Sequence, residues 1–202
     1  MNIYLEWGVA FQRKPGEVET GDLYLVKPFP GGYLVAVIDG IGHGREAALA
    51  AQSAASILEA NPQENINILI QRCHEALRNT RGVALTLASF NCKEMTMTWE
   101  GIGNVEGIIC YNSLRARASS KSLLLRPGIV GCNLPNLQEN SLKVSTGDTL
   151  ILATDGIHYC FSQGLDVSAS PQQIAEKILS RYAKGNDDAL VLVARLAQGG
   201  KK

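Results

Sequence analysis

Short apolar runs rich in β-branched residues recur along the whole chain, and this recurrence limits the folds that the chain can adopt. The runs predict strands over residues 3–11, 22–27, 33–38, 83–90, 94–101, 105–111, 114–118, 122–126, 141–145, 149–154 and 189–195. Three segments have helical character, at residues 45–60, 63–79 and 171–183. So many strands exceed what one twisted open sheet readily holds. The sequence therefore predicts an α+β fold in which two packed antiparallel sheets are flanked by helices.

The composition is that of one compact, folded domain. The chain has 202 residues, of which 46% are hydrophobic, so it can bury a sizeable core and falls outside the low-hydrophobicity regime of disordered chains. No linker or low-complexity tract divides it. We therefore expect a single domain over residues 1–198, followed by a flexible C-terminal tail over residues 199–202.

The charge balance argues against several functional classes. Nineteen Lys and Arg residues offset nineteen Asp and Glu residues, whereas nucleic-acid-binding domains usually carry a basic excess. No apolar run approaches the roughly 20 residues of a membrane span, and the N-terminus lacks a signal-peptide layout. Five scattered cysteines without zinc spacing predict reduced thiols that act as small hydrophobes. We expect a cytoplasmic protein that binds neither nucleic acid nor a membrane.

A predicted hairpin brings two aspartates opposite each other. Residues 22–39 contain a short strand, a turn signal at 28–32 and a nearly continuous apolar strand. If the turn is centred between Pro30 and Gly31, residues whose numbers sum to 61 face each other, so Asp22 opposes Asp39. Directly opposed like charges destabilise a sheet, because their Cβ atoms are only about 4.5–5.5 Å apart. Such a pair indicates a site that binds positive charge.

Three further aspartates are predicted to join this pair. The apolar strands that end at Asp39 and Asp155 each continue as Asp-Gly-Ile, while Asp187 and Asp188 stand just before the last strand. In an antiparallel sheet the start of one strand lies beside the end of its neighbour. We therefore expect these acidic residues to converge at one edge of one sheet.

Clustered carboxylates at the ends of buried strands need positive charge, because an unpaired buried ion costs several kcal/mol. No Lys or Arg is adjacent in sequence to these aspartates, and all-oxygen ligation suits hard cations such as Mg²⁺ or Mn²⁺. A single Asp-Gly pair is equally well explained by a turn, and a single Asp by a helix cap. The metal hypothesis therefore depends on the four motifs taken together.

The ordered motifs resemble those of the metal-dependent type 2C (PPM) Ser/Thr protein phosphatases. The motifs are GlyAsp at 21–22, AspGlyIleGlyHisGly at 39–44, ThrAspGly at 154–156 and AspAsp at 187–188. The resemblance covers nearly the whole chain. It is strongest to the compact bacterial branch that includes SpoIIE and RsbX, through residues 101–106 and 127–131. It implies a four-layer αββα sandwich of two antiparallel sheets between pairs of helices, with two Mn²⁺ or Mg²⁺ ions at one end.

The resemblance also implies a role for each motif residue. Asp39 would bridge both ions, and Asp22 and the Gly40 carbonyl would bind one of them. Asp155 and Asp187 would hold the other ion. Asp188 would orient Asp187 or coordinate through water, and the motif alone does not decide which of the two is the direct ligand.

Two such ions would activate a water molecule that attacks phosphorus directly, without a phosphoenzyme. The departing serine or threonine oxygen needs a proton, and His43 is the nearest titratable candidate, although a histidine in a glycine-rich turn can also be without a role. Asp39 and His43 are therefore the predicted catalytic residues.

The predicted function is that of a phosphoserine/phosphothreonine protein phosphatase. By resemblance, its substrates and partners would be phosphorylated STAS-domain proteins of a stressosome-type signalling module. A catalytically silent binding protein with the same fold is the alternative, and the aspartates present at all four motifs argue against it. A nuclease-like metal hydrolase is disfavoured by the neutral charge balance.

Overall fold

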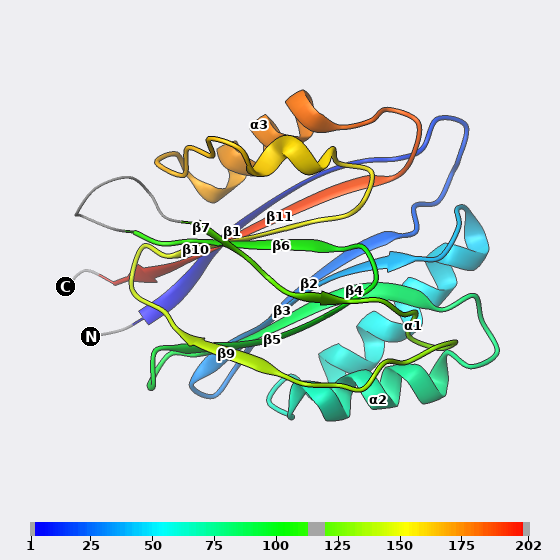
Figure 1. The fold of residues 1–202 in the computed structure, drawn as a ribbon, viewed down its shortest axis with the longest axis horizontal. Helices are drawn as coiled ribbons and strands as arrows, with labels where there is room; N and C mark the ends of the chain where they lie inside the picture. The colour runs from blue at the N-terminus through cyan, green and yellow to red at the C-terminus, as the bar shows by residue number, and fades with distance from the viewer. Residues whose placement is uncertain (1–2, 113–119, 200–202) are drawn as a thin grey trace.

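Two β-sheets pack face to face in the computed structural model, which describes residues 3–112 and 120–199 (Figure 1). The first sheet has the strand order β1 (Ile3–Gln12), β11 (Ala189–Gln198), β10 (Thr149–Ala153), β6 (Glu106–Cys110) and β7 (Ser120–Ser122). The second has the order β2 (Asp22–Phe29), β3 (Gly32–Gly40), β4 (Val83–Asn91), β5 (Thr96–Ile102) and β8 (Leu125–Arg126), with β9 (Asn140–Lys143) also paired to β5.

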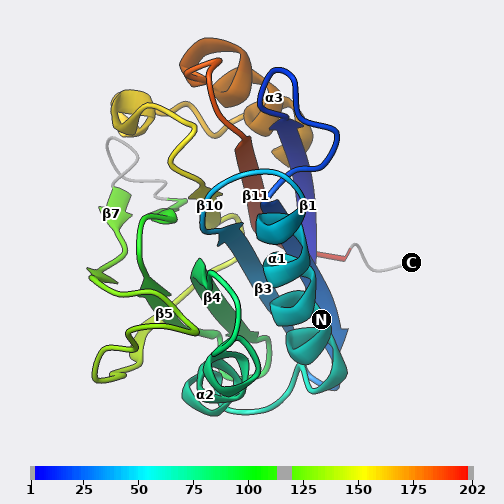
Figure 2. The same cartoon turned by 90° about the vertical axis from the view of Figure 1, so that its right-hand side faces the viewer.

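Helices cover the outer faces of both sheets, so the molecule has four layers (Figures 1 and 2). The second sheet carries α1 (Arg45–Ala60) and α2 (Ile66–Ala76), whereas the first carries α3 (Pro171–Tyr182) and the short 3-10 helix η1 (Tyr159–Ser162). The predicted sandwich is confirmed. The expected pair of helices on each side is wrong for the first sheet, where the described residues form one α-helix and a single 3-10 turn.

The core is divided by the two sheets into three apolar clusters. One fills the space between the sheets and includes Val35, Leu152 and Leu192. A second lies between the second sheet and the helices α1 and α2, and the third lies under α3. Burial of these three layers is the main force that holds the sheets and helices together.

Helix α1 lies very close to the second sheet because the contacting residues are small. Five alanines of α1 are buried, and the backbone of Gly40 passes so near the helix that a Cβ there would sit 2.2 Å from the Ala47 carbonyl oxygen. This close packing fixes the start of α1 directly beside the end of β3. The loop between them, residues 41–44, is thereby held in place.

Three local predictions are wrong. Residues 122–126 form no single strand, because the chain leaves the first sheet at Ser122 and joins the second at Leu125. The second sheet is not wholly antiparallel, since β8 runs parallel to β5. Cys132 is exposed, although Cys73 and Cys110 are buried as expected.

Two further expectations fall wholly or partly outside the described residues. The strand predicted over 114–118 lies outside them, as do residues 200–202 of the predicted tail. None of the helices in the described ranges has the length and apolar composition that a membrane crossing requires.

The predicted hairpin register is confirmed. Strands β2 and β3 pair antiparallel, with Asp22 opposite Asp39 and Lys27 opposite Leu34. The end of β3 is therefore marked by two facing carboxylates, as the sequence indicates.

The packing of α1 makes a direct prediction about stability. Leu58 is fully buried, whereas Leu49 on the same helix is 53% exposed. We expect Leu58→Ala to lower the free energy of unfolding by about 2–5 kcal/mol, because the truncation leaves a cavity. The matched change Leu49→Ala should cost less than about 0.5 kcal/mol. Urea unfolding of both variants tests this, and similar losses would contradict the placement of α1.

Candidate metal centre

The sequence-predicted acidic residues converge in one pocket of about 250 Å³. The pocket is lined by Lys14, Asp22, Asp39, Ile41, Gly42, His43, Asn104, Asp155, Asp187 and Asp188. Gly40 is buried and is not among the lining residues, although it directly follows Asp39.

The expectation that these aspartates share one sheet is wrong. Asp22 and Asp39 belong to the second sheet, while Asp155 and Asp187 flank strands β10 and β11 of the first. The pocket therefore lies between the two sheets, at the end where β3 and β10 finish and β11 begins. Packing of the sheets, and not strand pairing alone, brings the carboxylates together.

Asp22 is held by a hydrogen bond that crosses between the sheets. The Thr154 hydroxyl, just after β10, donates to Asp22 Oδ2 over 2.6 Å and accepts from the Leu190 N–H over 2.9 Å. Asp22 is 4% exposed, so it depends on such protein donors for its hydrogen bonds. Thr154 is a site residue that the sequence motif contained but whose role the sequence did not reveal.

Asn104, in the loop between β5 and β6, contacts one carboxylate of the pocket. Its Nδ2 donates to Asp155 Oδ2 over 2.7 Å. Its Oδ1 is buried and has no hydrogen-bond partner within the described ranges. The only sequence signal for this residue was its place in the 101–106 segment, because a neutral amide adds nothing to a charge pattern.

Asp187 and Asp188 differ in how their carboxylates are used. Both oxygens of Asp188 accept backbone N–H groups over 2.9 Å, one from Lys14 and one from Gly21. Within the described ranges, Asp187 Oδ1 accepts a single hydrogen bond, from the N–H of Asp188 over 3.0 Å. Asp188 therefore ties the loop between β1 and β2 to the start of β11.

Burial and mutual repulsion raise the pKa of two of the carboxyl groups. For Asp22, burial and then the neighbouring Asp39 raise the pKa from 3.8 to about 8, against the opposing effect of the Thr154 hydrogen bond. For Asp39, burial and then Asp155 raise the pKa to about 7. The pocket therefore strongly favours a positively charged partner at neutral pH.

The donor set fits hard divalent cations. Among the ion pairs formed within residues 3–112 and 120–199, none includes Asp22, Asp39, Asp155, Asp187 or Asp188. Carboxylate and carbonyl oxygens are the ligands that Mg²⁺ and Mn²⁺ prefer. As they stand, no three acidic, His or Cys side chains of the described chain are arranged to hold an ion. Thr154 and Asn104 each engage a single carboxylate oxygen, Oδ2 of Asp22 and Oδ2 of Asp155.

His43 lies at the rim of the pocket, in the loop that leads into α1. Its Nδ1 is 2.6 Å from Glu17 Oε1, a contact that sequence reasoning missed because Glu17 belongs to a loop with no motif. His158, by contrast, is exposed and is not among the pocket-lining residues.

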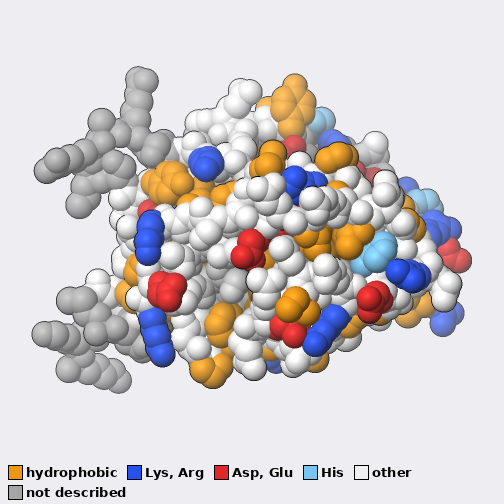
Figure 3. Space-filling view, turned by 60° about the horizontal axis from the view of Figure 1, so that its bottom comes forward, with side chains coloured by type: hydrophobic (Ala, Val, Ile, Leu, Met, Phe, Trp, Pro, Cys, Tyr) orange, Lys and Arg blue, Asp and Glu red, His pale blue; other side chains and the backbone are white. Residues whose placement is uncertain are grey.

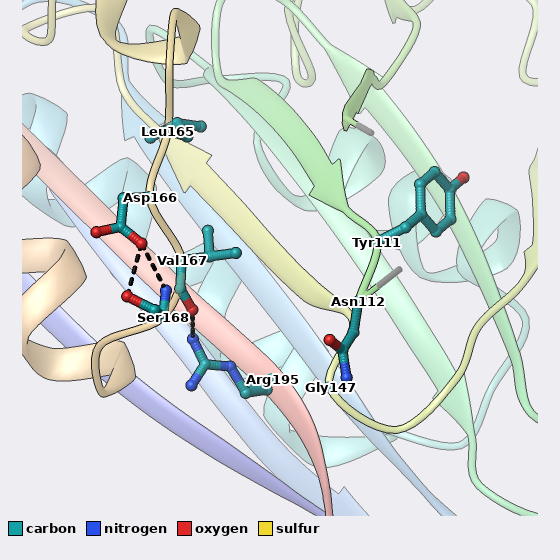
Figure 4. Close-up of a pocket in the computed structure, with 8 residues that line it drawn as sticks. All are labelled: Tyr111, Asn112, Gly147, Leu165, Asp166, Val167, Ser168 and Arg195. Atoms are coloured by element: carbon teal, nitrogen blue, oxygen red, sulfur yellow. Dashed lines mark hydrogen bonds between the residues drawn. The ribbon is translucent and has the colours of Figure 1, made fainter. Parts of the chain in front are cut away.

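A larger hollow, of about 450 Å³, lies near the opposite end of the first sheet and has a different character (Figure 4). Its one arginine, Arg195, donates from Nε to Thr149 Oγ1 over 3.0 Å and from Nη2 to the Val167 carbonyl over 2.6 Å. Asp166 accepts hydrogen bonds from both the N–H and the hydroxyl of Ser168. These polar groups are already bonded to one another and hold the loop before α3 in place. The acidic pocket is therefore the better candidate for a functional site.

Comparison with known proteins identifies the family. The family model described as Stage II sporulation protein E (SpoIIE) matches residues 30–197, which is most of the chain. The chain therefore belongs to the SpoIIE family.

Three proteins illustrate the similarity. Phosphoserine phosphatase RsbX of Bacillus subtilis (strain 168) is 22% identical over 199 residues, covering 97% of each chain. A solved structure of RsbX in complex with magnesium matches with a TM-score of 0.85, at 23% identity and 96% coverage of each chain. The catalytic domain of the serine/threonine phosphatase PstP, in complex with two manganese ions, matches with a TM-score of 0.71 at 14% identity, covering 98% of this chain and 100% of that one.

A further structure comes from work on "The bacterial stressosome: a modular system that has been adapted to control secondary messenger signaling". It is 30% identical, with a TM-score of 0.85, and the match covers 95% of this chain and 100% of the other.

The raised carboxyl pKa values predict how the metal-free protein responds to pH. Asp22 and Asp39 hold protons in the folded state up to a pH of about 8 and about 7, whereas in the unfolded chain they release them near 3.8. The folded state therefore binds more protons between these values, so its stability should fall as the pH rises from 4 to 8.

Urea unfolding in chelator at pH 5 and pH 8 measures this fall. Asp22→Asn should flatten the pH dependence, because it removes the group with the higher pKa. Saturating Mg²⁺ or Mn²⁺ should restore stability at pH 8, by about 2.7 kcal/mol at one hundred times the dissociation constant. Stability that rises with pH in chelator would contradict this account of the pocket.

Proposed function

We propose that the chain is a metal-dependent protein phosphatase that hydrolyses phosphoserine and phosphothreonine, with residues 1–198 as one catalytic domain. The observation that carries the proposal is the pocket of five aspartates without a cationic side-chain partner among the described residues. Membership of the SpoIIE family and the similarity to phosphoserine phosphatase RsbX support the same activity.

Two Mn²⁺ or Mg²⁺ ions are the proposed cofactors. Asp39 would contact both, with Asp22 and the Gly40 carbonyl on one side and Asp155 and Asp187 on the other. We favour Asp187 over Asp188 as the direct ligand, because both Asp188 oxygens are already engaged by backbone N–H groups. When bound, the ions would activate water for attack on phosphorus and neutralise the phosphoryl oxygens.

The chain's own residues supply the remaining chemistry. His43 would donate a proton to the departing seryl or threonyl oxygen, since it lines the pocket and histidine is the side chain that most often transfers protons in enzymes. Helix α1 begins just beyond it, and its N-cap residue, Gly44, makes no side-chain capping bond. The positive end of that helix therefore lies near the site and favours an anionic substrate.

The proposed substrates are phosphorylated STAS-domain proteins of a stressosome-type module in the cytoplasm. The similarity to RsbX and to a structure from work on the bacterial stressosome supports a role in such a module. Two other functions fit less well. A silent binding protein would have no need of the complete carboxylate set. A nuclease would need a basic excess, whereas nineteen Lys and Arg residues are offset by nineteen Asp and Glu residues, and the one face that Figure 3 shows intersperses both.

The proposal predicts the effect of two neutralising substitutions. Asp39→Asn and Asp155→Asn should each reduce Mn²⁺-dependent phosphate release from a phosphoserine peptide by more than about 100-fold, because outer-shell partners of metal sites alone account for about 10–100-fold. Asp166→Asn, far from the pocket, is the matched control and should leave the rate unchanged. The proposed mechanism would be excluded if phosphate release continued in the presence of chelator, or if neither substitution reduced it.

A further inference from the structure

Glu17 lies at the junction between the acidic pocket and helix α1. Its Oε1 lies 2.6 Å from His43 Nδ1. Its other oxygen, Oε2, lies near Gly44, the N-cap residue of α1, since a Cβ added there would be 3.0 Å away. The side chain of Glu17 is 29% exposed and that of His43 is 52% exposed, so the pair is open to solvent and accessible to a protein substrate.

The backbone around Glu17 is fixed by the same residue that borders the proposed metal ligands. Asp188 accepts the N–H of Lys14 before Glu17 and the N–H of Gly21 after it. Between these anchors, the Glu17 N–H donates to the Lys14 carbonyl over 3.1 Å. The loop that carries Glu17 is therefore held at both ends against the start of β11, which sets the position of the carboxylate.

We infer that Glu17 is the positioning residue of His43, which holds the imidazole by Nδ1 and leaves Nε2 as the nitrogen available to the pocket. The inference rests on the proposed phosphatase function, because in that reaction Nε2 would donate the proton to the leaving group. A carboxylate can only accept a hydrogen bond, so a short contact to Nδ1 requires that Nδ1 carry a proton. Among the ion pairs of the described residues, Glu17 is the acidic partner of His43.

In the reaction, water releases one proton to solvent as its oxygen forms a bond to phosphorus, and the bond between phosphorus and the seryl oxygen breaks. The seryl oxygen takes the proton from His43 Nε2, and the imidazole, which keeps its Nδ1 proton, regains the Nε2 proton from solvent. The Glu17 carboxylate accepts from Nδ1 and so fixes the orientation of the ring during the transfer. The same pairing of a histidine with an orienting carboxylate gives direction to proton transfer in other enzymes.

A purely structural role for Glu17 makes a different prediction. If its carboxylate served only to stabilise the loop or the start of α1, its loss would lower hydrolysis of every substrate alike. If it acts through His43, the loss should depend on how much the leaving group needs a proton. A seryl alkoxide needs one, whereas p-nitrophenolate is stable in water near neutral pH.

The experiment compares a phosphoserine peptide with p-nitrophenyl phosphate, both with saturating Mn²⁺. We expect His43→Gln to lower the peptide-to-aryl ratio of kcat about 100-fold, the lower end of the range for general acid catalysis. Glu17→Ala should lower the same ratio about tenfold, and Glu17→Gln, which keeps an acceptor oxygen, should lower it less. Glu19→Ala, an exposed acid of the same loop, is the matched control and should leave the ratio unchanged.

The double variant Glu17→Ala/His43→Gln tests whether Glu17 acts through His43 or independently of it. It should show the ratio of His43→Gln alone, because a positioning residue has no effect once its partner is gone. The inference would be overturned if the double variant lowered the ratio by the product of the two single effects, or if Glu17→Ala slowed both substrates equally. Either result would leave the phosphatase function intact. No metal-dependent release from either substrate by the wild-type protein would instead refute the proposed function.

A second measurement tests the contact without metal or turnover. In ¹⁵N-imidazole NMR spectra of the metal-free protein at a pH where His43 is neutral, the His43 signals, assigned by their loss in His43→Gln, should report a proton on Nδ1. Glu17→Ala should shift the populations toward the Nε2-protonated form. A His43 tautomer that is the same with and without Glu17 would overturn the inference.

Discussion

Electrostatic repulsion among carboxylates held at the meeting point of two sheets is the constraint on which the rest of the site depends. Asp22 and Asp39 face each other across a hairpin, and both carboxyl groups have raised pKa values because they are buried beside further acids. A fold keeps such an arrangement only if something else stabilises it. The three apolar layers of the sandwich provide that stability, and bound cations would remove the repulsion.

The neighbouring residues form a connected set around this cluster. Thr154 carries a hydrogen bond between the two sheets, Asn104 holds Asp155, and Asp188 anchors the loop from β1 to β2. That loop in turn presents Glu17 to His43. The same residue, Asp188, therefore borders the acidic pocket and anchors the loop that carries Glu17.

Much of this could be predicted from the sequence, because it depends on local patterns. The turn at Pro30 and Gly31 fixed the register of the hairpin, and strand periodicity located nearly every strand. The assignment of strands to sheets could not be obtained in this way, so β3 and β10 were wrongly expected in one sheet. Sheet membership depends on long-range packing. Glu17 and Asn104 were missed because a loop acid and a neutral amide belong to no periodic pattern.

The central proposal is that Asp22, Asp39, Asp155 and Asp187 would hold two ions, with Asp39 in contact with both. Crystals grown with Mn²⁺ and measured for anomalous scattering test it most directly. The account predicts two peaks about 3.5–4 Å apart, each about 2.0–2.6 Å from an Asp39 oxygen, with Asp22 on one and Asp155 on the other. Ordered Mn²⁺ that does not contact Asp39, or no ordered Mn²⁺ in the pocket at saturating concentration, would contradict it.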